Sequence, residues 1–162
     1  MEIEKKFTIK ELPENLDSYK KFEIEQGYLC SKPVVRIRKK NDKYILTYKN
    51  RNGISQDVAC ACEEIEMELS EESFYHLKEK CDGNIIRKTR YVIPIEDNLK
   101  VELDVFHGHL EGLRFAEVEF RTEEQAKNFK LLPWFLKDVT HDKRYKNSFI
   151  KDLKDTSCYE KG

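Results

Sequence analysis

The sequence of 162 residues predicts an α+β domain in which strands dominate and pair as an antiparallel sheet or barrel. Three observations support this class. Apolar and charged residues alternate with a period of two in at least seven segments, which is typical of strands with two chemically different faces. Short turn signals separate several of these segments. Only three segments carry helix signals, so seven or eight strands joined mainly by turns are expected.

The alternating segments follow one another along most of the chain. In each, charged side chains occupy one face and Val, Ile, Leu, Met, Phe or Tyr much of the other. The seven segments are MEIEKKF at 1–7, VVRIRKK at 34–40, YILTYK at 44–49, EIEMEL at 64–69, RKTRYVI at 87–93, KVELDVF at 100–106 and AEVEF at 116–120. Turns are predicted at Asn41-Asp42, at Asn52-Gly53, which is a strong hairpin signal, and at Asp97-Asn98.

Helices are expected in three places. Ser70 can cap a helix that begins with two glutamates, carries Phe74, Leu77 and Cys81 at core spacing and stops at Gly83. The segment from Thr122 to Gln125 has the pattern of a capping box, which predicts a short helix that ends before Pro133. A third helix is predicted from Pro13 through Leu16 and Tyr19.

Length and composition indicate one domain over residues 1–150, followed by a polar and loose tail over 151–162. The 30 basic and 31 acidic residues nearly cancel, which does not favour nucleic-acid binding. No apolar run is long enough to span a bilayer, and the N-terminus has no signal-peptide pattern. The odd number of five cysteines favours reduced thiols, so a cytoplasmic location is the expectation. Cys60 and Cys62 are interpreted as ordinary strand residues.

Charges are sorted by strand. Four strands each carry two carboxylates at positions i and i+2, which places both on one face roughly 7 Å apart; the pairs are Glu2/Glu4, Glu66/Glu68, Glu102/Asp104 and Glu117/Glu119. Cations occupy matching positions of three other strands: Arg36/Arg38, Lys49 and Lys88/Arg90. Lys6 adds one cation to the first strand. For any single strand, a solvated polar face explains the pattern. A solvent face usually mixes both signs within one strand, so it explains this sorting poorly.

If the sheet closes with these charged faces inward, the lumen has basic and acidic walls. Basic walls suit a polyanion such as a phosphate chain, and acidic walls suit Mg²⁺ or Mn²⁺. Phosphoryl transfer requires mainly alignment and charge neutralisation, which such a lumen supplies. The sequence contains no GxxxxGK[ST], GxGxxG or HExxH motif, and its four histidines form no ligand pattern.

Several blocks resemble those of the CYTH domain, the triphosphate tunnel metalloenzyme superfamily. Glu2-Ile3-Glu4-Lys5-Lys6 is similar to the ExExK motif of that family. The resemblance continues in order through QGYL at 26–29, RIR at 36–38, LTYK at 46–49, EIEME at 64–68, KTRY at 88–91, ELDVF at 102–106, EVEF at 117–120 and VTHDKRY at 139–145. The QGYL and VTHDKRYKN blocks resemble the compact bacterial branch, which is associated with tripolyphosphate hydrolysis.

This resemblance implies an eight-stranded antiparallel tunnel with a few helices packed outside, and it implies roles for individual residues. Substrate phosphates would be bound by Lys6, Arg36, Arg38, Lys49, Lys88 and Arg90, with Lys143 and Arg144 as further candidates on the C-terminal segment. Metal ligands would be Glu2, Glu4, Glu117 and Glu119. Lumen acids that orient water or bind a second metal would be Glu66, Glu68, Glu102 and Asp104. Lys6 and Arg38 are expected to act in catalysis together with these acids, so alanine at either position should depress turnover far more than fold stability. Tyr28 and Tyr145 are expected to be packing residues.

The expected activity is metal-dependent hydrolysis of inorganic tripolyphosphate to pyrophosphate and phosphate, with Mg²⁺ or Mn²⁺ as cofactor. Two alternatives stay open: adenylate cyclase or nucleoside or thiamine triphosphatase chemistry in the same tunnel, and a module that binds polyphosphate without turnover. The expected partner is a small-molecule triphosphate, without nucleic acid or membrane. Apolar positions on the outside of the barrel would allow a homodimer.

Overall fold

The computed structural model describes residues 2–50 and 60–159. The described residues form nine strands, all paired antiparallel: β1 Glu2–Ile9, β2 Lys20–Ser31, β3 Val34–Lys40, β4 Lys43–Asn50, β5 Cys60–Glu68, β6 Asp82–Pro94, β7 Lys100–Phe106, β8 Arg114–Phe120 and β9 Phe135–Asp138. Each of the seven alternating segments corresponds to a strand, although Leu69 follows the end of β5 and residue 1 lies outside the described residues. The hairpin predicted at Asn52-Gly53 lies outside the described residues.

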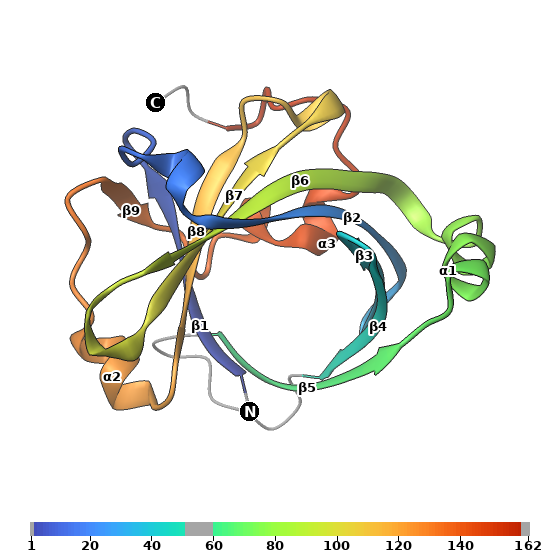
Figure 1. Ribbon diagram of the computed structural model, residues 1–162, viewed down its shortest axis with the longest axis horizontal. Coiled ribbons are helices and arrows are strands. Elements are labelled where there is room, and N and C mark those ends of the chain that lie inside the picture. The colour runs from blue at the N-terminus through green and yellow to red at the C-terminus, as the bar shows by residue number, and fades with distance from the viewer. Residues whose placement is uncertain (1, 51–59, 160–162) are drawn as a thin grey trace.

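Eight of the strands form a ring. The order of neighbours is β5-β4-β3-β2-β6-β7-β8-β1, and β1 also pairs with β5 through Glu2 to Glu4 (Figure 1). The first strand therefore has β8 along one edge and β5 along part of the other. The ninth strand, β9, continues this second edge, pairing with Phe7 to Ile9. An antiparallel barrel is the fold that the alternation and the resemblance predict.

The described helices are short: α1 Glu71–Lys78, α2 Glu123–Asn128 and α3 Asn147–Ile150. Helices α1 and α2 pack on the outside of the strands, whereas α3 packs at one end of the ring. The Ser70 hydroxyl accepts a hydrogen bond from the backbone N–H of Ser73, and the Thr122 hydroxyl accepts one from Gln125, so both predicted caps are confirmed. Four 3₁₀ turns complete the elements: η1 Leu16–Ser18, η2 Glu96–Asn98, η3 Gly108–Leu110 and η4 Lys143–Tyr145.

The structure differs from the sequence prediction at four elements. The helix predicted to stop at Gly83 ends at Lys78, so Cys81 lies outside it and Gly83 belongs to β6. The helix expected from Pro13 to Tyr19 is only the turn η1, because Asn15 adopts a left-handed conformation (φ 57°) immediately before it. Strands β2 and β9 are not among the predicted segments. A bulge between Tyr28 and Cys30 interrupts the register of β2 with β3, and β9 is only four residues long.

Apolar side chains form two clusters on opposite sides of the sheet. The first covers the outer face of β1, β7 and β8 and includes Phe7, Leu103 and Val118, with Phe135 of β9 stacked 4.7 Å from Phe7 between ring centroids. The second fills one end of the ring from inside, with Ile86, Phe106 and Phe115 among its members. These three residues lie two positions from Lys88, Asp104 and Glu117, so the same strand faces carry an apolar plug at one end and charges farther along.

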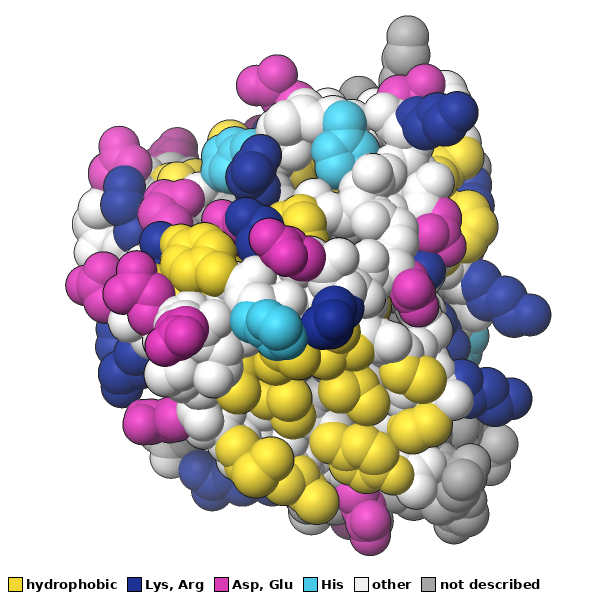
Figure 2. Space-filling view, turned by 90° about the vertical axis from the view of Figure 1, so that its right-hand side faces the viewer, with side chains coloured by type: hydrophobic (Ala, Val, Ile, Leu, Met, Phe, Trp, Pro, Cys, Tyr) yellow, Lys and Arg dark blue, Asp and Glu magenta, His cyan; other side chains and the backbone are white. Residues whose placement is uncertain are grey.

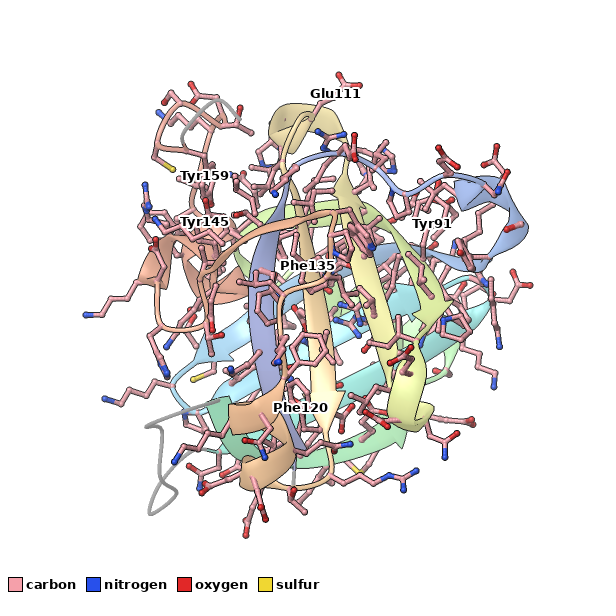
Figure 3. All side chains as sticks on the ribbon, turned by 90° about the vertical axis from the view of Figure 1, so that its left-hand side faces the viewer. Tyr91, Glu111, Phe120, Phe135, Tyr145 and Tyr159 are labelled. Atoms are coloured by element: carbon pink, nitrogen blue, oxygen red, sulfur yellow. The ribbon has the colours of Figure 1, made fainter. Side chains whose placement is uncertain are left out.

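The C-terminal segment covers the second cluster, which forms the apolar plug at one end of the ring. Ile150 and Tyr145 are buried in the second cluster, and Leu153 and Tyr159 pack against it. The ring centroids of Tyr145 and Tyr159 are 5.1 Å apart, and Figure 3 shows the two side chains next to each other. The described part of the segment predicted to be a loose tail, residues 151–159, is therefore packed against the barrel.

One outer wall remains largely uncovered. On β5, Ile65 and Met67 are 57% and 58% exposed, and Figure 2 shows apolar side chains gathered on this side of the molecule. The helix α1 covers the neighbouring wall, where Phe74 packs 5.1 Å from the ring of Tyr44. Among the described helices, none has the length and apolarity needed to cross a membrane.

Candidate active site

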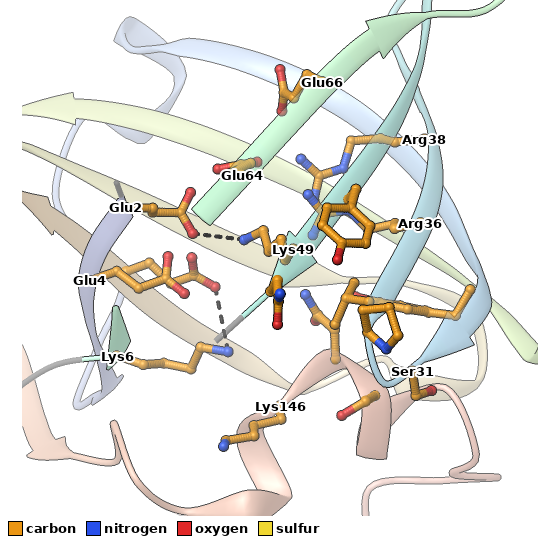
Figure 4. A pocket seen from close by; sticks show the side chains of 18 of the residues that line it. Glu2, Glu4, Lys6, Ser31, Arg36, Arg38, Lys49, Glu64, Glu66 and Lys146 are labelled. Atoms are coloured by element: carbon orange, nitrogen blue, oxygen red, sulfur yellow. Dashed lines mark hydrogen bonds and ion pairs between the residues drawn. The ribbon is translucent and has the colours of Figure 1, made fainter. Parts of the chain in front are cut away.

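A cavity of about 750 Å³ occupies the ring beyond the apolar plug. Most of its walls are inward side chains of β1, β3, β4, β5, β7 and β8, because alternate residues of each strand point the same way. Eleven residues that the sequence singled out line it: Glu2, Glu4, Lys6, Arg36, Arg38, Lys49, Glu66, Arg90, Glu102, Glu117 and Glu119. Figure 4 shows Glu2, Glu4 and Lys6 of β1 on one side of the cavity and Arg36 and Arg38 of β3 on the other.

The acidic wall is built by β1 and β8. Their register places Glu4 opposite Glu119 and Lys6 opposite Glu117. Burial, with the nearby charge of Glu117, raises the pKa of Glu4 to about 8, and burial also raises the pKa of Glu2 and of Glu119. Burial acts in the same direction on Glu117, but Lys6 and Arg90 hold its pKa well below the usual range. For Glu2, Glu4 and Glu119, the nearby cations therefore do not offset the cost of burying a negative charge.

Two lysines compensate part of this wall. The Lys49 ammonium donates to Oε1 of Glu2 at 2.8 Å, and that of Lys6 lies 3.5 Å from Oε1 of Glu117. Burial alone would lower the pKa of Lys49, but Glu4 and Glu2 raise it. Lys6 also donates to the backbone carbonyl of Tyr145 at 2.5 Å, which ties the C-terminal segment to the site.

The basic wall lies on β3. Arg36 and Arg38 are both buried, with 5% and 7% of their surfaces exposed. The guanidinium of Arg38 donates through Nε and Nη2 to Oε1 of Gln26, at 3.0 and 2.8 Å. Nε of Arg36 has no hydrogen-bond partner among the described residues. Because the Gln26 amide carries no charge and Nε of Arg36 has no partner among the described residues, the positive charge of both guanidiniums is available to an anion.

A network of ion pairs connects the two walls through β6 and β7. Asp104 accepts from Lys88 at 2.7 Å and from Nε and Nη2 of Arg90 at 2.8 and 3.0 Å. Arg90 also donates to Glu102 at 3.0 Å. Arg90 and Glu102 reach the cavity, whereas Lys88 and Asp104 have no exposed side-chain surface and do not line it. These two lie behind the wall as buried counter-ions.

Three further predicted site residues lie away from the cavity lining. Glu68 is exposed near the end of β5. Lys143 is exposed in η4, and the guanidinium of Arg144 pairs with Asp142 at 2.7 Å and donates to the Cys158 carbonyl. The C-terminal segment contributes Lys146, Asn147 and Ser148 to the cavity instead. No sequence pattern signals these three, because they depend on how the segment folds back.

Other lining residues extend the alternation and could have been found from it. Lys40 is two residues beyond Arg38, and Glu64 is two residues before Glu66; both line the cavity. Tyr28, expected to be a packing residue, is 2% exposed and lines the cavity as well as belonging to the plug.

The carboxylates of the acidic wall fit a hard divalent cation by their chemistry. Glu2, Glu4 and Glu119 are oxygen donors whose raised pKa values show that added positive charge would stabilise their ionised forms. Within the described ranges, no group of three or more Asp, Glu, His or Cys side chains already converges on one point. Glu2 and Glu117 instead contact lysines.

A ring of antiparallel strands around a cavity with facing carboxylate and guanidinium walls defines a tunnel protein for anionic, phosphate-like ligands. No family model matches the chain. It is 36% identical over 152 residues to an inorganic triphosphatase of Nitrosomonas europaea, covering 92% of this chain and 95% of that protein. An inorganic triphosphatase of Acetivibrio thermocellus is 35% identical, with 91% and 90% covered.

Solved structures agree with this relation. A crystal structure of an inorganic triphosphatase matches with a TM-score of 0.70 and 33% identity, covering 96% of this chain and 97% of that one. A Hippeastrum protein described as a putative adenylyl cyclase with a dominant triphosphatase activity shares the fold, with a TM-score of 0.54 and 20% identity over 78% of this chain and 83% of that one. The chain belongs to the CYTH family of triphosphate tunnel enzymes, together with these inorganic triphosphatases.

Proposed function

We propose that this protein hydrolyses inorganic tripolyphosphate to pyrophosphate and phosphate in the cavity, with Mg²⁺ or Mn²⁺ as cofactor. The observation that carries the proposal is the pairing of two walls. The Arg36–Arg38 wall has no carboxylate partner among the described residues, and the carboxylate wall facing it is short of positive charge. The 36% identity to an inorganic triphosphatase gives the family context.

The basic residues would bind the phosphate chain. Arg36 and Arg38 present forked donors that match phosphate oxygens, and Arg90 adds a third guanidinium at the cavity wall. Lys6 and Lys49 place compact charges between the two walls. Held in this way, the three phosphates lie aligned, and the charge that develops on the leaving pyrophosphate is stabilised.

Glu2, Glu4, Glu117 and Glu119 are the residues that would hold the divalent cation. When bound, such a cation neutralises phosphate oxygens and polarises the phosphorus for attack. Glu102, opposite Glu117 in the register of β7 with β8, and Glu66, which also lines the cavity, would orient the attacking water by accepting its protons in hydrogen bonds.

Phosphate release from tripolyphosphate, ATP and thiamine triphosphate, measured side by side with Mg²⁺, Mn²⁺ or EDTA, tests the proposal. We expect tripolyphosphate to be the preferred substrate and EDTA to abolish its hydrolysis. Cyclic AMP formed from ATP would indicate a cyclase instead. Tight tripolyphosphate binding without turnover under either metal would indicate a binding module and contradict the proposal.

Variants test the site itself. Lys6→Ala and Arg38→Ala should each lower kcat/KM at least tenfold, because each removes a cation from the cavity, while Arg87→Ala, on an exposed side chain of β6, should leave it unchanged. Normal turnover in both cavity variants, with normal folding by circular dichroism, would refute the assignment. A homodimer stays a prediction, and sedimentation velocity of the wild type and of Met67→Lys would test it.

A further inference from the structure

Two guanidinium groups in the same barrel are held by different partners. Arg90 is held by two carboxylates, Asp104 and Glu102. Arg38, at a similar degree of burial, is held by Gln26, whose side chain is 0% exposed. Gln26 and Arg38 are direct partners in the register of β2 with β3, so their side chains lie on the same face of the sheet.

A glutamate at position 26 would suit the resting protein better than the glutamine does. Its carboxylate would give Arg38 charge-assisted hydrogen bonds, which are shorter and stronger than those to an amide. It would also remove a buried donor, because Nε2 of Gln26 has no hydrogen-bond partner among the described residues. The amide therefore leaves both a charge and a donor unsatisfied inside the barrel.

The surroundings of Arg38 add to this imbalance. Burial lowers the pKa of Arg38, and the neighbouring cations Arg36 and Arg90 act in the same direction. Nε of Arg36 likewise has no hydrogen-bond partner in the described part of the chain. Gln26 does not line the cavity, whereas Arg36 and Arg38 do, so Gln26 would act on a bound anion through Arg38 and not by direct contact.

We propose that Gln26 is a positioning residue that orients the Arg38 guanidinium with a neutral amide, so that the positive charge of the Arg36–Arg38 wall remains available to the polyanionic substrate. This inference deepens the proposed function and rests on it only in taking the polyanion to be tripolyphosphate. Gln26 thereby leaves the guanidiniums of β3 with more charge available to an anion than Arg90 of β6, which is held by two carboxylates.

The isosteric substitution Gln26→Glu separates charge from geometry. It keeps both hydrogen bonds to Arg38 but neutralises the guanidinium, so we expect the dissociation constant for tripolyphosphate to rise at least tenfold, with the melting temperature unchanged or higher. A purely structural role for Gln26 predicts unchanged binding in this variant. Gln26→Leu keeps the volume but removes both hydrogen bonds, so we expect weaker binding together with a lower melting temperature.

Gln125→Glu is the matched control. It makes the same change of charge at the N-terminus of α2, where the Gln125 side chain accepts a hydrogen bond from the backbone of Arg121 and a glutamate can do the same. Binding is measured by titration calorimetry with tripolyphosphate at constant ionic strength, without metal and with Mg²⁺. We expect wild-type affinity for this control.

The outcomes separate this inference from the proposed function. A wild type that binds tripolyphosphate without hydrolysing it, with weaker binding in Gln26→Glu, would refute the activity and support the inference. A wild type that hydrolyses tripolyphosphate, with unchanged binding and KM in Gln26→Glu or in Gln26→Leu, would refute the inference and leave the activity standing. A wild type that neither binds nor hydrolyses tripolyphosphate would refute both.

Discussion

At the scale of single residues, the charged groups of the barrel divide into those that face the cavity and those sealed behind its wall. Lys88 and Asp104 belong to the sealed group, with no exposed side-chain surface and an ion pair of 2.7 Å. Removing one partner of such a pair leaves an uncompensated buried charge, which commonly costs about 3–5 kcal/mol. Their proximity to Arg90 suggests that they shape the site through its wall and not by contact with the substrate.

Lys88 should make stability depend on pH. Burial lowers the pKa of Lys88 from 10.5 to about 7. The carboxylates of Asp104 and Glu117 oppose this shift, whereas the nearby cations Arg90 and Arg38 add to it. Between these values the unfolded chain binds a proton that the native protein has lost, so the free energy of unfolding should rise with pH, by at most roughly 1.4 kcal/mol per unit.

Urea unfolding of the wild type and of Lys88→Met at pH 7, 8, 9 and 10 measures this contribution. Methionine keeps an unbranched side chain and has no proton to lose, while Asp104 keeps its two bonds from Arg90. We expect the stability difference between the two proteins to change with pH in favour of the wild type. Parallel profiles would contradict the assigned pKa.

At the scale of elements, the C-terminal segment packs against β1, although the two are at opposite ends of the sequence. The hydroxyl of Tyr159 donates to the Arg144 carbonyl at 2.5 Å, and its ring packs on that of Tyr145. The Tyr145 carbonyl in turn accepts from the Lys6 ammonium. Packing of the last described residues thus helps to orient a cation in the cavity.

Tyr159→Phe tests this support. It removes one hydrogen bond and keeps the ring, so we expect a loss of about 1 kcal/mol in the free energy of unfolding. Because Tyr145 would be less firmly held, we also expect kcat on tripolyphosphate to fall severalfold. Tyr91→Phe, which alters a half-buried tyrosine of β6 outside the cavity lining, is the control. A stability loss without any change in kcat would show that the segment contributes only to packing.

At the scale of the whole molecule, closure of the ring joins residues that are distant in the sequence. Strand β1 pairs with β5 and with β8, which places Glu4 opposite Glu119 and Lys6 opposite Glu117. Strand β3 lies on the opposite wall. A polyanion and a divalent cation bound between these walls would hold the strands together.

Ligand should therefore stabilise the fold. With Mg²⁺, tripolyphosphate at one hundred times its dissociation constant should add about 2.7 kcal/mol, which raises the melting temperature by several degrees. Scanning calorimetry of the wild type, Arg36→Ala and Arg87→Ala with tripolyphosphate, or with sulfate at equal ionic strength, measures the shift. We expect Arg36→Ala to lose most of it. An equal shift with sulfate would mean that the effect is non-specific.

Much of the site could be predicted because strand alternation is a local property. Once Glu2 and Glu4, or Arg36 and Arg38, occupy alternate positions of a strand, they must share a face, and a polar face that sorts its charges by strand indicates a lumen. The family assignment is confirmed by the relatives. The cytoplasmic location and the metal preference stay predictions.

Seven of the nine described strands, the two helix caps and the charges that alternate along those strands could be predicted without coordinates, because they depend on neighbours one to four residues apart. Which charges pair with one another depends instead on the folded arrangement of the strands. In the folded protein, Lys88 forms a buried ion pair with Asp104, and Arg38 donates hydrogen bonds to the amide of Gln26. Lys146 lines the cavity, whereas Arg144 does not. Those choices depend on register between strands and on how the C-terminal segment folds back, which are contacts between residues far apart in the chain.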